Sequence, residues 1–536
     1  MIKYNVLPKI GLFVILFIIS SISAQLYIPA DPFDILFTEQ KIMMGGDDPG
    51  SLIIRPIILT PNQSKKSWSL KVRNEAFYND GGPNLENTSD RWIGNGISIF
   101  TSANIAYSNE FMFASIEPFY FRSQNTIRSE PQRIPKFSHL NDNIAHKESP
   151  YTSTGFRETQ LYLHYKGIGG GFSNANMWWG PGFHSSLMMS NNTTGFEHLM
   201  LGTISEKRIK DWGFNGRYIF SKFGEKSKSK PYYSGFIANA TYYSIPIITI
   251  GFSRAFLSGG KNTNYDIGAL EAALLPFQFV TIEKPKNQED LLNPVDQTFT
   301  GYINLRFPKS GLVMFLEYGR NEGPESFKDF ILHPDHSKAY VFGVRKYGLF
   351  NNLNLMFGFE YTSLIQTSFW QARKTQDWNS ASQFDFNTYD GRYWAAHSGP
   401  DSDDFTVYFA YNRNKLSIMP SVNLERYSIT HASALVTQYA GTLVYDRIYG
   451  INYLGEDRSV LYAMGHLSGG KLEFRMDIRY LFRGYKLSLN YEHELHFNRE
   501  FIQSAPIIVN ADNEIENRGW EIEHSNIFWI SMEKYF

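Results

Sequence analysis

The stretch KLEFRMDIRYLF, residues 471–482, is followed by Arg483-Gly484 and then by YKLSLNYEHELHF, residues 485–497. Apolar and aromatic residues alternate with charged or polar ones through both runs. Because successive residues of a strand point to opposite faces, each run predicts a strand with one apolar face and one polar face. The two-residue connection between them predicts a tight hairpin.

The same alternation recurs elsewhere in the chain, in segments long enough to cross a membrane. It is found in Thr298–Phe307, Gly311–Tyr318, Leu353–Thr362, Asp404–Tyr411 and Lys415–Tyr427. A tilted strand spans a bilayer with ~9–11 residues, and its backbone groups must all be paired there, so such strands must close into a barrel. We therefore expect an all-β protein, a transmembrane antiparallel β-barrel of roughly sixteen to twenty strands, an even number. The charged inward faces favour a wet lumen, and a barrel of this size is wide enough to hold water.

Composition agrees with a barrel and limits the partners. Aromatic residues make up 16% of the chain, with 43 Phe and 33 Tyr, yet the mean hydropathy is only −0.31. Strands that are apolar on one side produce this combination, although a large secreted β-sandwich enzyme remains the competing class. The formal net charge of −1 indicates no polyanion-binding surface, so we expect no nucleic-acid partner.

The sequence predicts three regions, which are a leader, a short N-terminal segment and one large barrel. Lys3 and Lys9 flank the start of an apolar run, Ile10–Ile19, that is too short to span a bilayer, and SISAQ at 21–25 offers a cleavage site after Ala24. The chain has no cysteine, which excludes disulfides, thiolate metal sites and cysteine nucleophiles. We predict a signal peptide at 1–24, a periplasmic N-terminal segment at 25–66 in which a short helix fits residues 31–46, and an outer-membrane barrel with long extracellular loops at 67–536.

The C-terminus and one insertion carry further signals. The chain ends in Phe536, and outer-membrane barrels end in an aromatic strand that the barrel-assembly machinery reads, so we expect that machinery and outer-membrane lipids as partners. Lys534 departs from the apolar pattern and is expected to snorkel to the interface. YDIGALEAALL, residues 265–275, predicts a short helix in an insertion around 264–276. Long polar loops are expected at Asn125–Thr154, Lys284–Gln297 and Thr375–Ser402.

A candidate binding segment is NMWWGPGFHSSLMMSNNTTGF, residues 176–196. Tandem tryptophans beside amides and hydroxyls suit sugar rings, which stack on indole and need hydrogen-bond partners. The alternative is an interfacial aromatic girdle or a turn-locking role. Two glutamates on inward strand faces join the candidates. The predicted carbohydrate-binding residues are Trp178, Trp179, Asn191, Asn192, Glu317 and Glu360.

The chain resembles the capsule-assembly Wzi family of outer-membrane proteins. The motifs that carry the resemblance are WWGPG at 178–182, LMMSNN at 187–192, FPKSGLVMFLEYGRN at 307–321, ILHPDHSKAYVFGV at 331–344, FEYTSL at 359–364 and HSGPDSDD at 397–404. The resemblance implies an 18-stranded barrel with small helical elements toward the periplasm. It also implies a lectin-like, non-catalytic role, in which capsular or extracellular polysaccharide is held at the cell surface without being exported through the barrel.

Other functions have weaker support in the sequence. His184, Ser185 and Ser186 are adjacent but lack a G-x-S-x-G elbow, so we expect no enzyme; a hydrolase would lose turnover on Ser185→Ala or Glu360→Gln. His333 and His336 fit a hydrogen-bonded loop better than a metal site, and no metal or cofactor is expected. The strongest alternative is a porin or solute-specific outer-membrane channel, because a wide lumen with mixed charge would also serve diffusion.

Overall fold

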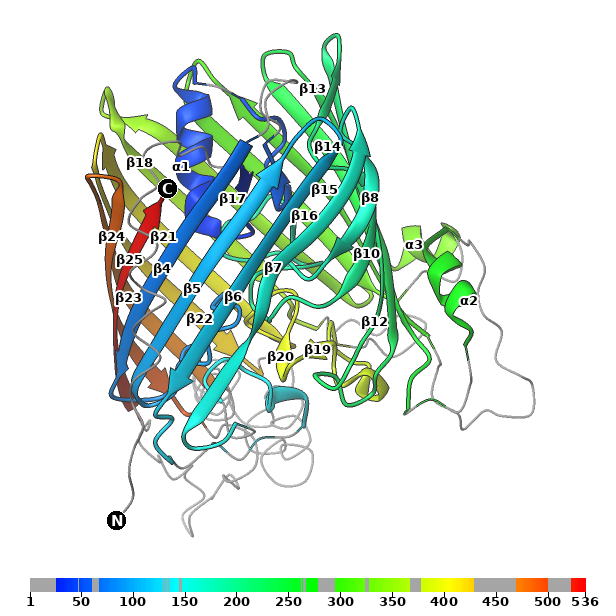
Figure 1. Cartoon of the computed structure of the whole chain (residues 1–536). Coiled ribbons are helices and arrows are strands. Elements are labelled where there is room, and N and C mark those ends of the chain that lie inside the picture. The colour runs from blue at the N-terminus through cyan, green and yellow to red at the C-terminus, as the bar shows by residue number, and fades with distance from the viewer. Residues whose placement is uncertain are drawn as a thin grey trace, which may run out of the picture.

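The computed structural model describes residues 26–536 except 47, 60–66, 129–130, 132, 134, 144–146, 262, 264–266, 278–294, 323–326, 367–376, 429–468 and 500–521. The predicted signal peptide at 1–24 therefore lies outside the described residues. The chain forms a closed antiparallel barrel (Figure 1). Its strands are β4 (Ser67–Asn79), β5 (Gly96–Ser108), β6 (Met112–Ser123), β7 (Tyr151–Tyr165), β8 (Ile168–Ser173), β10 (His198–Thr203), β11 (Lys207–Ile209), β12 (Trp212–Lys222), β13 (Tyr232–Tyr242), β14 (Ile247–Ser258), β15 (Val295–Phe307), β16 (Leu312–Asn321), β17 (Lys338–Leu349), β18 (Asn352–Ser363), β21 (Ser402–Arg413), β22 (Leu416–Tyr427), β23 (Gly469–Phe482), β24 (Tyr485–Phe497) and β25 (Ile522–Tyr535).

These segments make 18 barrel strands in the described part of the chain. β10 and β11 both pair with β12, β10 through Leu199–Gly202 and β11 through 207–209, so the two act as one interrupted strand. The barrel closes where β25 pairs with β4, and the backbone N–H of Phe536 donates to the carbonyl of Leu70 at 2.8 Å. Closure pairs the wall strands with one another, as a membrane-spanning sheet requires. The predicted fold class is confirmed.

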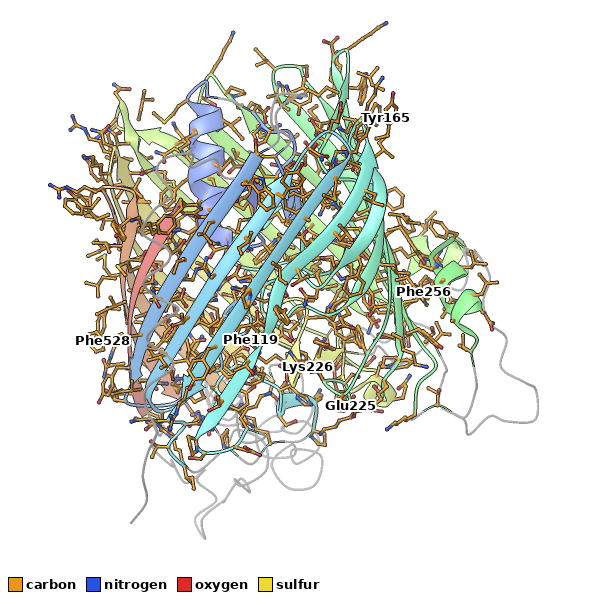
Figure 2. All side chains as sticks on the ribbon, viewed as in Figure 1. Phe119, Tyr165, Glu225, Lys226, Phe256 and Phe528 are labelled. Atoms are coloured by element: carbon orange, nitrogen blue, oxygen red, sulfur yellow. The ribbon has the colours of Figure 1, made fainter. Side chains whose placement is uncertain are left out.

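The hairpin of β23 and β24 confirms the alternation from which the fold was predicted. Arg483 and Gly484 form its turn with φ of 48° and 81°, as a two-residue turn between twisted strands requires. On β23, Phe474 is 45% exposed on the outer surface, whereas Glu473 is 4% exposed and faces the lumen. Figure 2 shows the same outward direction for Phe528 of β25. The outer face is therefore apolar, and the inner face carries the charge.

The two ends of the barrel differ in the length of their connections. At one end, turns of two to four residues join the strands, and at the other end the connections are nine residues or longer. Short turns belong to the periplasmic side and long loops to the extracellular side of an outer-membrane barrel. Tyr165 marks the periplasmic rim and Lys226 the extracellular end (Figure 2). The long loops predicted at 125–154 and 375–402 both leave the extracellular end, although β7 already begins at Tyr151. The third predicted loop, 284–297, lies outside the described residues up to 294, and its last three residues belong to β15.

Short helices occupy the places that the sequence predicted. α1 (Pro32–Met43) begins after Asp31, whose side chain accepts a hydrogen bond from the N–H of Phe33 and so caps the helix. α2 (Ala269–Leu274) and the turn Leu275–Phe277 pack on the outer wall, where the hydroxyl of Tyr218 donates to the carbonyl of Ala273. A further short helix, α3, covers Phe327–Leu332. None of the described helices is long and apolar enough to cross a membrane.

Chain segments fill the lumen. Residues 26–46, 48–59, 174–197 and 378–401 fold inward and form what we call the lumenal plug, with the first two ranges counted as one segment. The first carries α1 and three two-residue strands, β1 (Tyr27–Ile28), β2 (Ile54–Arg55) and β3 (Ile57–Ile58); the second carries β9 (Trp178–Trp179); the third carries a 3-10 turn (Ser382–Phe384), β19 (Thr388–Tyr389) and β20 (Arg392–Tyr393). Figure 1 shows α1 near the periplasmic end and β19–β20 near the extracellular end.

The wet lumen expected from the inward charges is wrong for much of the barrel. Aliphatic and aromatic side chains of the plug form a dry cluster with the inner faces of β10 and β12–β15. Phe196 meets Tyr233 of the wall with ring centroids 5.6 Å apart, and Trp394 meets the same ring at 5.9 Å. The expectation failed because inward side chains face other parts of the chain rather than water.

Candidate functional site within the lumen

The tandem tryptophans lie in the middle of the lumenal plug. Trp178 and Trp179 form β9, which pairs with Ile54 and Arg55 of β2. Both tryptophans are 0% exposed. The Arg55 guanidinium lies 4.7 Å from the centre of the Trp178 ring, while Trp179 belongs to the apolar cluster of the lumen. Both faces of the segment are thus used, one by a cation and one by hydrocarbon.

The Gly-Pro-Gly turn after the tryptophans needs glycine because other groups approach its backbone closely. A Cβ atom on Gly182 would lie 2.0 Å from the carbonyl oxygen of Ser185, and one on Gly180 would lie 2.5 Å from the hydroxyl of Ser186. Arg55 donates to the carbonyl of Gly182 at 2.9 Å. The turn is therefore fixed from both sides, and any side chain at either glycine would displace it.

Glu360 and Glu317 hold the plug against the wall. One oxygen of the Glu360 carboxylate accepts the N–H of Phe183 at 2.7 Å, and the other accepts those of His184 at 3.0 Å and Ser185 at 2.7 Å. Glu317 accepts the N–H of Leu187 at 3.3 Å. A carboxylate that gathers three backbone donors satisfies a turn that would otherwise be buried without partners.

Asn191 and Asn192 join three inward loops. The amide of Asn191 accepts from Asn176 at 2.8 Å and donates to the carbonyl of Asn87 at 2.9 Å. Asn192 donates to the carbonyl of Tyr393 at 2.9 Å and accepts the N–H of Asn87 at 3.2 Å. The asparagines therefore connect the β4–β5 loop, the tryptophan segment and β20.

All six predicted carbohydrate-binding residues thus gather around one plug segment, 176–196. Each is buried: Asn191 is 8% exposed, and the other five are 2% exposed or less. The side chains of the five residues other than Trp179 each have a polar or cationic partner within the protein, and the Trp179 ring is packed in hydrocarbon. Their role in glycan binding stays a prediction, since a sugar would reach them only if the plug opened.

A second group of side chains meets beside this segment, and sequence reasoning missed it. We call it the two-histidine cluster: Glu86, His184, His397, Asp404 and Glu425. The five residues come from five places in the chain, three loops and the strands β21 and β22. The His184 and His397 rings stand edge to face, with centroids 4.4 Å apart. Glu360 positions His184, because it binds the backbone N–H of that residue.

Carboxylate oxygens surround the imidazole of His397. Its Nε2 lies 2.9 Å from Glu425, 3.2 Å from Asp404 and 3.6 Å from Glu86. His184 Nε2 lies 3.2 Å from the same Asp404 oxygen. Burial disfavours the charged imidazolium, but Glu425 and Asp404 outweigh burial and raise the pKa of His397 to about 10.

More negative charge lies directly alongside. The ammonium of Lys471 contacts Glu86 and lies 3.8 Å from Glu425, and it also approaches Glu473 at 3.4 Å and Glu494 at 3.7 Å. Asn84 donates to Glu473 and to Glu492, at 3.1 and 2.7 Å. The guanidinium of Arg475 is shared between Glu492 and Asp477. Carboxylates therefore outnumber basic groups in this part of the lumen.

Part of this cluster had a signal in the sequence. Strand alternation placed Glu425 on an inward face, and HSGPDSDD at 397–404 was recognised as a motif. Their meeting with Glu86 and His184 had no local signal, because long loops bring these residues in. The adjacent serines form no triad with His184: Ser186 donates to the carbonyl of Trp179, and the Ser185 hydroxyl is buried without a hydrogen-bond partner.

Comparisons with known proteins agree with this architecture. The family model described as "Capsule assembly protein Wzi" matches residues 67–421. A solved structure described as Wzi, an outer membrane protein involved in group 1 capsule assembly in Escherichia coli and a carbohydrate binding beta-barrel, is 8% identical, with 86% of this chain and 83% of that chain covered and a TM-score of 0.51. No curated protein sequence matches the chain.

Two further structures are less similar. OccAB2 of Acinetobacter baumannii is 9% identical, with 88% of this chain and 98% of that chain covered and a TM-score of 0.41. OprD of Pseudomonas aeruginosa is 10% identical, with 88% and 94% covered and a TM-score of 0.39. The family model, by contrast, spans well over half of the chain, from the first barrel strand into β22. The chain belongs to the capsule assembly protein Wzi family and is an outer-membrane barrel.

Proposed function

We propose that this protein holds capsular or extracellular polysaccharide at the cell surface, as a lectin-like barrel that makes and breaks no bond. The observation that carries the proposal is the lumenal plug. Three segments of the chain cross the bore and pack against its wall, with Trp178, Trp179 and Arg55 buried at their centre. A polymer therefore meets the extracellular end of the barrel rather than a channel through it.

The six predicted carbohydrate-binding residues serve this function through the plug. Glu317, Glu360 and the two asparagines fix the tryptophan segment to the wall and to the extracellular loops. A rigid plug gives the loops above it a fixed arrangement, which reduces the entropy lost when they bind a ligand. Many weak contacts along one polymer then add up, because each bound repeat raises the local concentration of the next.

Two other partners follow from the surface of the barrel. The outer face, with residues such as Phe474 and Phe528 exposed, supports contact with outer-membrane lipids. The terminal Phe536, which continues the pairing of β25 with β4, supports recognition by the barrel-assembly machinery. Deleting Phe536 is expected to lower the amount of protein in the outer membrane, measured by fractionation, without changing the polysaccharide made.

The anchoring role is tested in a deletion strain. Loss of the protein is expected to shift polysaccharide from the cell-bound to the released fraction, and the intact gene restores binding. Total polysaccharide stays unchanged, because no synthetic or export step is removed. If cells without the protein kept their polymer attached, the proposal would fail.

Conductance separates anchoring from transport. Purified protein in a planar bilayer is expected to show no steady current, whereas a porin measured in the same bilayer conducts. Steady conductance, together with solute uptake that depends on the protein, would favour the channel alternative over anchoring.

Charge at the extracellular end gives a matched test of where an acidic polymer binds. Lys226 and Lys228 are exposed there, and Lys210 is exposed in a periplasmic turn. If the polymer is acidic, replacing Lys226 and Lys228 by alanine is expected to weaken its binding and reduce the salt dependence of binding. Lys210→Ala should leave both unchanged, since the polymer does not reach that end.

A further inference from the structure

We propose that the two-histidine cluster binds a divalent transition-metal ion of the zinc class, which ties the lumenal plug to the barrel wall. The ligands are His184, His397, Glu86 and Glu425, with Asp404 beside them. Suitable ligand atoms of the first four all lie within 4.8 Å of one another. The proposal departs from the sequence-based expectation of no metal, and it does not depend on the glycan function.

The spacing of these atoms fits a single ion. An ion bound tetrahedrally by nitrogen and oxygen at ~2.0–2.1 Å keeps its ligand atoms about 3.3 Å apart. The distances around His397 Nε2 run from 2.9 to 3.6 Å, and His184 Nε2 lies 3.2 Å from Asp404. Small side-chain rotations would therefore bring these groups into coordination.

Unsatisfied polar atoms point into the same space. The Nε2 of His397, one oxygen of Asp404 and one oxygen of Glu425 are buried and lack hydrogen-bond geometry with any partner. Their side chains are 0%, 1% and 2% exposed. One imidazole N–H can serve only one of the carboxylates that face it, so the other oxygens remain unsatisfied. A metal ion would satisfy all of them at once.

The charge balance also calls for a cation. The two-histidine cluster brings three carboxylates together, and Glu473, Glu492 and Glu494 adjoin them. Lys471, Arg475 and, when protonated, His397 are the basic side chains in contact with this group, and Arg475 is shared with Asp477. Buried charges without partners are costly, so either protons or a metal ion must compensate. Metal binding would displace protons from the cluster to solvent.

The donor set selects the class of metal. Two imidazoles with carboxylates suit zinc and similar transition metals, whereas Ca²⁺ and Mg²⁺ prefer oxygen alone. The neighbouring trio Glu473, Glu492 and Glu494 is a poorer site, because it offers no imidazole and two of its carboxylates already accept hydrogen bonds from Asn84.

An ion bound to the two-histidine cluster would connect the plug to the barrel wall. His184 belongs to plug segment 174–197 and His397 to plug segment 378–401, while Asp404 and Glu425 lie on wall strands β21 and β22. Asn423 supports them, since its amide donates to Asp404 and lies 3.0 Å from His184 Nε2. Removing the ion should loosen the extracellular half of the plug first.

Metal analysis of the full-length protein from outer membranes tests this. Protein purified without chelator is expected to hold about one zinc ion per chain by mass spectrometry. Stripping with dipicolinate should lower the thermal unfolding temperature, and Zn²⁺ should restore it while Mg²⁺ and Ca²⁺ do not. Absence of bound metal, together with no uptake of Zn²⁺ or Co²⁺ by stripped protein, would overturn the proposal.

Variants separate this site from adventitious binding. His184→Gln with His397→Gln should abolish binding, and Asn423→Ala should weaken it about 10- to 100-fold, as expected for a group that orients ligands. His198→Gln is the matched control, because His198 is also buried and its Nδ1 lies 2.8 Å from the carbonyl of Phe196, away from the proposed ligands. If the double variant fails to fold, the visible spectrum of Co²⁺ bound to the intact protein decides, since imidazole coordination gives characteristic bands. Equal binding by wild type and double variant would contradict the assignment.

Discussion

The two sides of the lumen differ sharply although their strands alternate in the same way. Along β10 and β12–β15 an apolar cluster lines the inner wall, with Ile219, Tyr233 and Leu257 packed against the plug beside mostly uncharged polar residues such as Asn239 and Thr249. Along β22–β25 and β4–β7 the inner wall carries ion pairs such as Arg157–Glu117 at 3.3 Å and Arg73–Glu533 at 3.5 Å, next to a smaller apolar cluster that contains Phe77 and Phe100. One barrel therefore has a dry side and an ionic side.

The plug explains the difference. Segment 176–196 turns Trp179, Met188 and Met189 toward the dry side, while His184 lies with the carboxylates on the ionic side. The inner wall is complementary to whichever part of the plug it meets, as in a protein–protein interface. The two-residue alternation of a strand shows which of its side chains face the lumen. The part of the plug that lies opposite determines which groups those side chains contact.

The largest effect is expected on the dry side. Trp179→Ala removes a fully buried indole from the apolar cluster, and the cavity should cost about 3–5 kcal/mol of unfolding free energy. Denaturant unfolding in detergent measures the loss. Trp212→Ala is the matched control, because Trp212 is 46% exposed on the outer face of β12 and should cost less than about 1 kcal/mol. Equal losses would show that the plug contributes little packing.

A smaller effect is expected where the plug is tied to the wall by hydrogen bonds. Glu360→Gln keeps the shape but replaces one carboxylate oxygen with an N–H₂ donor, so at least one backbone N–H loses its partner. The expected cost is about 2–3 kcal/mol, with brief openings in planar-bilayer recordings. Glu225→Gln makes the same chemical change at an exposed extracellular side chain and should alter neither measurement. If Glu360→Gln changed neither the unfolding free energy nor the bilayer recordings, packing alone would hold the plug.

Sequence patterns could predict the wall, and for physical reasons they could not predict the plug. The strand expected at 471–482 is observed at Gly469–Phe482, and the one at 485–497 has the expected bounds. Helices near 31–46 and 265–275 were also found, at Pro32–Met43 and Ala269–Leu274, because caps and apolar periodicity act locally. The contacts of Asn192 with Asn87 and Tyr393 join residues more than one hundred positions apart, and no local period encodes them.

The smallest effect is expected at the extracellular rim of the ionic side, and it depends on pH. Arg133 donates twice to Asp142, both at 2.7 Å, and Arg499 donates to it at 3.0 Å. Burial alone would raise the pKa of Asp142, but the two guanidinium groups hold it well below its usual range. Glu523 and His496 also lie close to Arg499.

Because the pKa of Asp142 is lowered in the folded protein, acid should destabilise the extracellular rim. The ionised Asp142 stabilises the folded loops at every pH above its unfolded-state pKa of about 4, and the contribution is lost as pH falls below that value. Acidification from pH 6 to pH 3 should therefore cost about 1–2 kcal/mol locally, seen as faster hydrogen exchange in residues 133–143. Asp142→Asn should already exchange fast at pH 6 and respond less to acid. If wild type and Asp142→Asn responded to acid alike, carboxylates elsewhere on the ionic side would cause the faster exchange. The rim would then not be the part of the ionic side that is most sensitive to acid.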